Sequence, residues 1–232
     1  MQTIIEAIAQ AIQLILTLDP VVVEIAGRTL LVTSIALSIS MVVGVPAGAW
    51  LAVARVPGKK LFTAFIYTGM GMPPVVAGLA VYLLLSRAGP LGDLGWVFTI
   101  RAIVVAQVII ATPLVVGVTM SAVLAVEPAL FFQLRALGAT RLQARLAVLY
   151  EARVGVIVGL VAGFGSIISE VGAVMLVGGN IDGSTRVLTT AIVLETRKGN
   201  FDLALALGII LLGLSFMANL GMALGQGRLQ HL

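Results

Sequence analysis

Long apolar runs without charge constrain this chain most. Residues 29–54, 61–86, 102–126 and 203–227 hold no charged residue, and residues 154–181 hold one, Glu170. A helix needs about 20 apolar residues to cross a bilayer core. Only helices and closed barrels satisfy the backbone in lipid, and these runs do not alternate as barrel strands do. We therefore predict an all-α integral membrane protein with about five transmembrane helices.

The composition excludes several other classes of protein. The 232 residues are 60% hydrophobic and 10% charged, whereas soluble domains are about 25% charged. The spans fill the chain, so we expect one transmembrane domain over residues 1–232. The net charge of +4 is scattered and forms no stripe for nucleic acid. There is no cysteine, and the single histidine, His231, is next to the C-terminus, so we predict no metal site.

The N-terminal stretch, residues 3–18, differs from the spans. Isoleucines recur at helical spacing, Glu6, Gln10 and Gln13 fall largely between them, and the stretch ends at Asp19-Pro20. It is short for a span. We predict an amphipathic helix that lies at the membrane interface or against a partner, and a short span remains the alternative.

The basic residues give a weak orientation. Eight of them fall in one set of connecting segments and six in the other. The first set is Arg55, Lys59, Lys60, Arg135, Arg141, Arg145, Arg153 and Arg228; the second is Arg28, Arg87, Arg101, Arg186, Arg197 and Lys198. Cytoplasmic loops carry the excess of Lys and Arg. This count predicts an N-terminus outside the cell and a C-terminus in the cytoplasm.

The polar segment between the third and fourth runs is the most informative. Residues 127–148 begin with Glu127-Pro128, and Gly138 divides them. Proline suits a first helical turn. We predict two short helices, 129–137 and 139–148, joined by an elbow at Gly138 and held at the membrane surface. The elbow suits docking into a groove on a partner; an ordinary amphipathic loop is the alternative.

The same segment resembles the cytoplasmic coupling loop of ABC-importer permeases. Gly138 stands at the glycine of the family pattern, and Val148, at the expected distance, replaces its isoleucine. The sequence departs from the pattern where Leu134-Arg135-Ala136 replaces Glu-Ala-Ala and where Tyr150 and Glu151 replace Leu-Pro.

Other segments resemble the oxyanion branch of this family, which carries molybdate, sulfate and tungstate. They are residues 73–79, 89–92, 169–180, 185–192 and 194–199, and the last two are most like the tungstate permeases. The resemblance covers most of the chain from Thr29 onward.

The resemblance implies a type I ABC-importer permease fold in the inner membrane. Two copies of the chain would form the pathway, a cytoplasmic ATPase dimer would dock on the coupling loops, and an extracytoplasmic binding protein would deliver the oxyanion. ATP and Mg would bind the ATPase, so this chain would be no enzyme and hold no cofactor. The predicted ATPase contacts are Arg135, Ala136, Leu137, Gly138, Ala139 and Thr140.

Several residues within the runs are candidates for the pathway or a gate. Pro73-Pro74 must break backbone hydrogen bonds, so Met70, Pro73 and Pro74 mark either a gate or a static kink. Glu170 is costly at membrane depth, and structural or gating support is favoured over contact with an anion. Polar side chains that could touch an anion are Thr112, Ser166, Ser169 and Asn180, or each could bond its own helix backbone.

Two other functions remain open at this stage. A stand-alone secondary transporter usually has more spans and internal repeats, and we find no repeat. A membrane anchor without a conduit would leave the coupling-loop resemblance unexplained.

Overall fold

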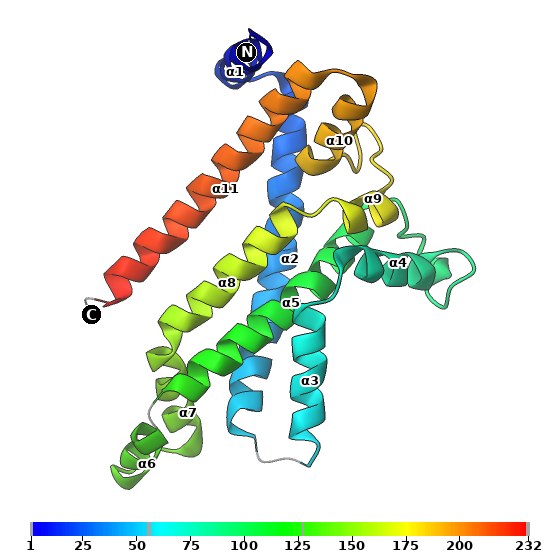
Figure 1. Ribbon diagram of the computed structural model, residues 1–232. Coiled ribbons are helices and arrows are strands. Elements are labelled where there is room, and N and C mark those ends of the chain that lie inside the picture. Colours follow the sequence, from blue (N-terminus) through cyan, green and yellow to red (C-terminus); the bar gives the residue numbers. More distant parts are fainter. Residues whose placement is uncertain (1, 55–56, 127, 231–232) are drawn as a thin grey trace.

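The computed structural model describes residues 2–54, 57–126 and 128–230. These residues form helices and no strand, as predicted. The helices are α1 (Gln2–Leu16), α2 (Pro20–Val53), α3 (Lys59–Met70), α4 (Pro74–Leu85), η1 (Gly92–Leu94), α5 (Ile100–Ala125), α6 (Pro128–Ala136), α7 (Arg141–Glu151), α8 (Arg153–Ile168), α9 (Gly172–Gly178), α10 (Leu188–Lys198) and α11 (Phe201–Gln230). The molecule is elongated, with α6 and α7 at one end and α1 and α10 at the other (Figure 1).

Helix α5 is the centre of the fold, between α2 and α8 (Figure 1). On α2 and on α8, glycines spaced by four residues let these two helices approach α5 closely. A methyl group on Gly48 of α2 would lie 2.5 Å from the Val116 carbonyl oxygen, and one on Gly155 of α8 would lie 2.4 Å from the Ala122 Cβ. In lipid the hydrophobic effect does not drive helices together. Small residues at the interface instead allow the backbones to approach closely, so that van der Waals packing stabilises the contact. These contacts therefore fix the three-helix core.

Among the described residues, three helices are long and apolar enough to cross a membrane: α2, α5 and α11. Two bent pairs, α3 with α4 and α7 with α8, raise the number to five if each pair is one span. The prediction of about five spans agrees with this range.

The second predicted run, 61–86, is not one kinked helix. The chain turns by 102° between α3 and α4, so α4 lies across the direction of α3. Pro73 and Pro74 supply no backbone N–H to continue the ladder of α3. Pro74 instead begins α4, where a missing N–H costs nothing.

The fourth predicted run, 154–181, is also divided, which the prediction of a single span missed. Helix α8 ends at Ile168 and α9 begins at Gly172. The Ser169 hydroxyl donates to the Gly165 carbonyl oxygen at 2.8 Å, and Glu170 Oε1 accepts from the Ala173 N–H at 2.8 Å. Side chains that bond the local backbone in this way compete with the helical ladder.

The N-terminal stretch is helical as predicted and lies across the end of the molecule, where α1 contacts α11 (Figure 1). Asp19 then caps α2, because its carboxylate accepts from the N–H groups of Val21 and Val22 at 3.0 and 3.1 Å. The side chains of Ile5, Ile12 and Leu16 remain exposed. An apolar face on the outside is typical of a helix in contact with lipid.

Candidate coupling elbow and transport pathway

The predicted elbow forms between α6 and α7 and has a defined geometry. Gly138 takes the left-handed conformation, with φ +90°, which glycine adopts at no steric cost. The Ala139 N–H donates to the Leu134 carbonyl at 3.0 Å and the Gly138 N–H to the Arg135 carbonyl at 3.2 Å. These two bonds form a Schellman motif, which ends α6.

Helix α7 then begins at a capping box. The Gln143 N–H donates to the Thr140 hydroxyl at 3.3 Å, and the Thr140 N–H donates to Gln143 Oε1 at 2.8 Å. Arg135 also donates to the Ala139 carbonyl across the turn. Reciprocal caps of this kind satisfy the free groups at a helix start. The two-helix prediction is confirmed, with bounds shifted by up to three residues.

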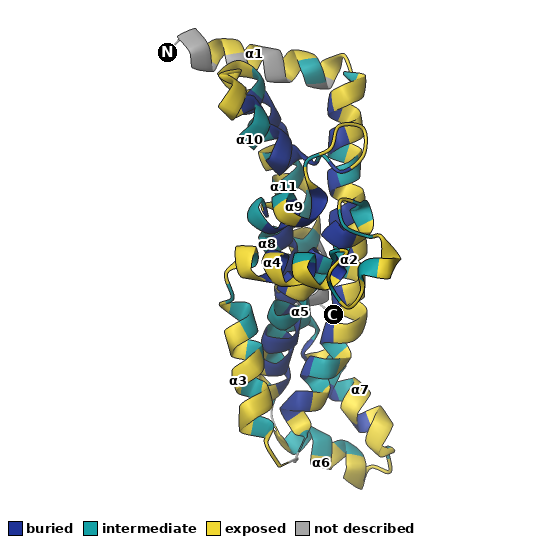
Figure 2. Ribbon diagram, turned by 90° about the vertical axis from the view of Figure 1, so that its right-hand side faces the viewer, coloured by how far each residue is buried: buried dark blue, intermediate teal, exposed yellow. Residues whose placement is uncertain are grey.

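The apex of the elbow is open to its surroundings. Leu137 is 84% exposed, and Arg135, Ala136, Gly138 and Thr140 are exposed as well, whereas Ala139 is half-buried. Figure 2 shows that α6 and α7 are largely exposed at the end of the molecule. A rigid turn with an apolar tip is well suited to insertion into a groove on another protein.

The base of the elbow is buried against the long helices α2 and α5. Val148 and Ala152 are buried in a cluster with Leu51 of α2 and with Met120 and Val123 of α5. The elbow is therefore packed against both α2 and α5, and packed interiors do not deform continuously.

The two broken spans meet at their breaks. A methyl group on Gly78 of α4 would lie 2.5 Å from the Ala173 Cα of α9, and one on Gly172 would lie 2.5 Å from Val75 Cγ2. Thus α4 and α9 pack directly against each other. The structure brings the candidates Pro73 and Pro74, at the start of α4, to the same junction as Ser169 and Glu170, which precede α9.

Met70 ends α3 and packs against α5. A methyl group on Gly117 would lie 2.3 Å from its sulfur, and one on Gly69 would lie 2.8 Å from Pro113 Cγ. The first break is thus held against the central helix.

The second break is held by three hydrogen bonds from different elements. Glu170 is buried, and its carboxylate accepts from Ala173. The Thr189 hydroxyl of α10 donates to the Glu170 carbonyl at 2.9 Å, and Gln107 Nε2 of α5 donates to the Ile167 carbonyl at 3.1 Å. These contacts favour the interpretation that Glu170 supports the structure of the break rather than contacting an anion. Sequence reasoning missed Gln107, although it is the one amide in the run 102–126.

Two of the three hydroxyl candidates, Thr112 and Ser169, have hydrogen-bond partners within the protein. Thr112 donates to the Ser40 hydroxyl at 3.1 Å, and Ser169 bonds Gly165 in its own helix. Ser166 is half-buried on α8, one turn before the break. The Ser169 hydroxyl therefore bonds the backbone of its own helix, which is the alternative to contact with an anion. The Thr112 hydroxyl instead links α5 to α2.

Asn180 lies apart from this junction, in the loop after α9. It has a positive φ of +51°, and its Oδ1 is buried without a partner among the described residues. Arg28 Nη1 of α2 donates to the Arg186 carbonyl at 2.9 Å, and the Leu188 N–H donates to the Thr29 hydroxyl at 2.9 Å. These two bonds, absent from the sequence predictions, tie the loop to α2.

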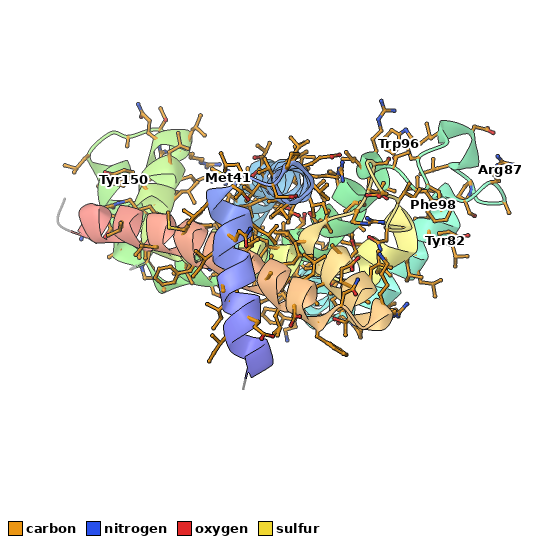
Figure 3. All side chains as sticks on the ribbon, turned by 90° about the horizontal axis from the view of Figure 1, so that it is seen from above. Met41, Tyr82, Arg87, Trp96, Phe98 and Tyr150 are labelled. Carbon is orange, nitrogen blue, oxygen red and sulfur yellow. The ribbon has the colours of Figure 1, made fainter. Side chains whose placement is uncertain are left out.

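An aromatic contact joins α4 to the loop before α5. The rings of Tyr82 and Phe98 lie 6.2 Å apart, and Phe98 N–H donates to the Val177 carbonyl of α9 at 2.8 Å. Figure 3 shows Tyr82, Arg87, Trp96 and Phe98 gathered on one side of the molecule, far from Tyr150. The helices α4 and α9 and this loop therefore form one cap beside the core. Among the described residues no His, Asp or Glu cluster could hold a metal ion.

Comparison with known proteins agrees with this architecture. Residues 44–230 match the family described as "Binding-protein-dependent transport system inner membrane component". The chain is 44% identical over 202 residues to the "Probable anion ABC transporter permease protein" of Haloferax volcanii, covering 85% of this chain and 87% of that one. It is 36% identical over 219 residues to the "Tungstate uptake system permease protein TupB" of Peptoclostridium acidaminophilum, covering 94% and 96%.

The fold is also similar to that of a solved transporter. A chain of the MetNI methionine ABC transporter in an inward-facing conformation superposes with a TM-score of 0.73 at 19% identity, covering 90% of this chain and 96% of that one. The fold is that of type I ABC-importer permeases, as predicted. The chain belongs to the binding-protein-dependent transport system inner membrane component family, in its oxyanion permease branch.

Proposed function

We propose that this chain is the permease subunit of an ATP-driven importer of tungstate, with molybdate or sulfate as the other oxyanions of the same class. The observation that carries the proposal is the α6–α7 elbow, a rigid turn with an exposed apex and a base buried against α2 and α5. The similarity to a permease named for tungstate, over nearly the whole of both chains, supports the choice of ion.

In this proposal the chain works as a homodimer and hydrolyses nothing itself. An ATPase dimer, which holds ATP and Mg, grips the elbow apex at residues 135–140. An extracytoplasmic binding protein delivers the ion at the opposite end. Closure of the ATPase dimer pushes the elbow, and the core helices rotate as a unit to switch access from one side to the other.

The elbow end then lies in the cytoplasm and the α1 end outside, with the N-terminus outside and the C-terminus inside. Lys59, Lys60, Arg135, Arg141 and Arg145 at the elbow end support this orientation. The cap of α4 and α9, with its breaks at Met70–Pro74 and at Ser169–Glu170, is the proposed gate. Thr112, Ser166 and Asn180 remain proposed pathway residues.

A charged side chain at the apex tests the coupling role. We expect Gly138→Arg to lose co-purification with the ATPase and substrate-stimulated ATP hydrolysis. Gly58→Arg is the matched control: its φ is +80°, against +90° for Gly138, and neither glycine has an atom within 4 Å of an added Cβ. Both variants introduce the same strain and charge, but only one lies on the elbow. Unchanged assembly and ATP hydrolysis in Gly138→Arg would refute the coupling role.

A secondary transporter remains the competing function. It predicts oxyanion uptake by the chain alone, driven by an ion gradient. An importer subunit predicts uptake only with the ATPase and the binding protein present.

A further inference from the structure

A groove of about 810 Å³ opens where the spans meet the elbow. Its walls come from the last turns of α2 and α5 and from facing sides of α6 and α7. Trp50, Phe132 and Leu146 line it and are 51%, 66% and 55% exposed. Large apolar side chains that remain this exposed in the protein mark a surface that is covered by something apolar.

The charged residues that line the groove are all basic among the described residues: Lys59, Arg141 and Arg145. Arg141 and Arg145 are one turn apart on α7, so they occupy one face of the helix. Neither guanidinium has a hydrogen bond or an ion pair with any described residue. Lys59 Nζ donates to the Ala52 carbonyl at 2.8 Å and keeps two further donors.

The groove lies at the depth where apolar spans end and polar helices begin. Trp50 belongs to the last turn of α2, and tryptophan is enriched at the headgroup level of membranes. The groove therefore presents apolar walls on the membrane side and cations on the elbow side. This combination matches a molecule with hydrocarbon chains and a negative head.

We propose that this groove binds an anionic phospholipid, with an acyl chain against Trp50, Phe132 and Leu146 and the phosphate at Arg141 and Arg145. A small free oxyanion gains nothing from the apolar walls, because these stabilise only apolar surface. Basic pockets between spans are known to hold anionic headgroups. The bound lipid joins α2 to the elbow, so coupling depends on anionic lipid. The site is separate from the proposed ATPase contacts at the apex.

Tryptophan quenching tests the proposal on the permease–ATPase complex in vesicles. The chain has two tryptophans, and Trp96→Phe leaves Trp50 as the reporter. The vesicles hold equal fractions of phosphatidylglycerol and phosphatidylcholine, with bromine on the chains of one lipid at a time. We expect Trp50 to be quenched more by the phosphatidylglycerol. Removing both arginines (Arg141→Gln with Arg145→Gln) should reduce this preference by about fivefold for each cation.

The control variant is Arg87→Gln with Arg197→Gln, which removes the same charge from exposed positions away from the groove. It should keep the preference. Equal quenching by the two lipids in the unaltered groove, or a preference that survives loss of both arginines, would overturn the proposal. So would a preference that the permease shows alone but loses in the complex, because the groove would then be an ATPase contact. Native mass spectrometry of retained phosphatidylglycerol checks the result without the Trp96 substitution.

Discussion

Two buried threonines on α2, one turn apart, have different roles. The Thr29 hydroxyl accepts from the Leu188 N–H and donates to the Ile25 carbonyl, whereas the Thr33 hydroxyl has no partner among the described residues. We expect Thr29→Val to lower the free energy of unfolding by about 1–3 kcal/mol, because it leaves a buried N–H unsatisfied. Thermal unfolding of the purified protein measures this loss.

Thr33→Val is the control for that prediction. It makes the same change of shape at a residue that is 1% exposed. No bond is lost there, so the melting temperature should stay the same or rise. Equal losses at the two positions would show that the hydroxyl of Thr29 does not hold the loop after α9.

Glu195 makes stability depend on pH. Hydrogen bonds from Asn200, at 2.7 Å, and from Lys198, at 2.8 Å, lower the pKa of this carboxyl from its usual range. The residue lies in α10, outside the spans. A lowered folded-state pKa gives stability that is present above the unfolded pKa and is lost as pH falls through the folded value. The melting temperature of the unaltered protein should therefore exceed that of Glu195→Gln near neutral pH, and the difference should vanish in acid.

The comparison with Glu195→Gln isolates the contribution of the Glu195 carboxylate to the pH dependence of the melting temperature. Other acidic groups also titrate, but they do so equally in both proteins. A difference between the two proteins that stays constant down to the lowest pH would contradict the assigned cause.

At the scale of elements, the α4–α9 contact leaves no room for added volume. A methyl group on Gly78 would lie 2.5 Å from the Ala173 Cα, a backbone atom that cannot rotate aside as the end of a flexible side chain can. We expect Gly78→Ala to cost about 1–3 kcal/mol through overpacking. It should also disturb transport, if the α4–α9 cap is the gate.

Gly208→Ala on α11 is the matched control, because an added methyl there meets no atom within 4 Å. Alanine favours a helix over glycine by about 1 kcal/mol, so this variant should be neutral or more stable. Equal melting temperatures for the two variants would show that α4 and α9 do not pack as closely as described.

The elements that followed from sequence are those set by local chemistry. Uninterrupted apolar runs predicted α2, α5 and α11, although α2 begins nine residues before its run, and Gly138 predicted the elbow. The break at Glu170 was missed because the run 154–181 holds only that one charge and is otherwise long and apolar enough for a span, whereas the side chains that divide it act through bonds to the local backbone. Glycines at spacing four, such as Gly155 and Gly159, could have predicted the contact with α5.

The site was predicted less completely than the elements. The apex residues 135–140 are contiguous in sequence, so one motif located them all. The cap depends on contacts between distant residues, such as Gln107 with Ile167 and Phe98 with Val177, and no periodicity encodes these. Asn180 was predicted as a polar residue that could touch an anion, and the structure shows it in the loop after α9, with a φ of +51°.

At the scale of the whole molecule, the fold places the α6–α7 elbow at one end and the cap of α4 and α9 beside the core. The base of the elbow and the broken spans share α5 as a common neighbour. A displacement at the elbow thus has a continuous packed route to the cap. We propose that this packed route couples ATP hydrolysis to transport.

The most direct measurement is tungstate accumulation in vesicles that contain the permease, its ATPase and the binding protein, with ATP on the side of the elbow. We predict uptake against a gradient that requires all three proteins and ATP, and that Gly138→Arg abolishes while Gly58→Arg does not. Uptake by the permease alone, or accumulation that continues without ATP, would contradict the account.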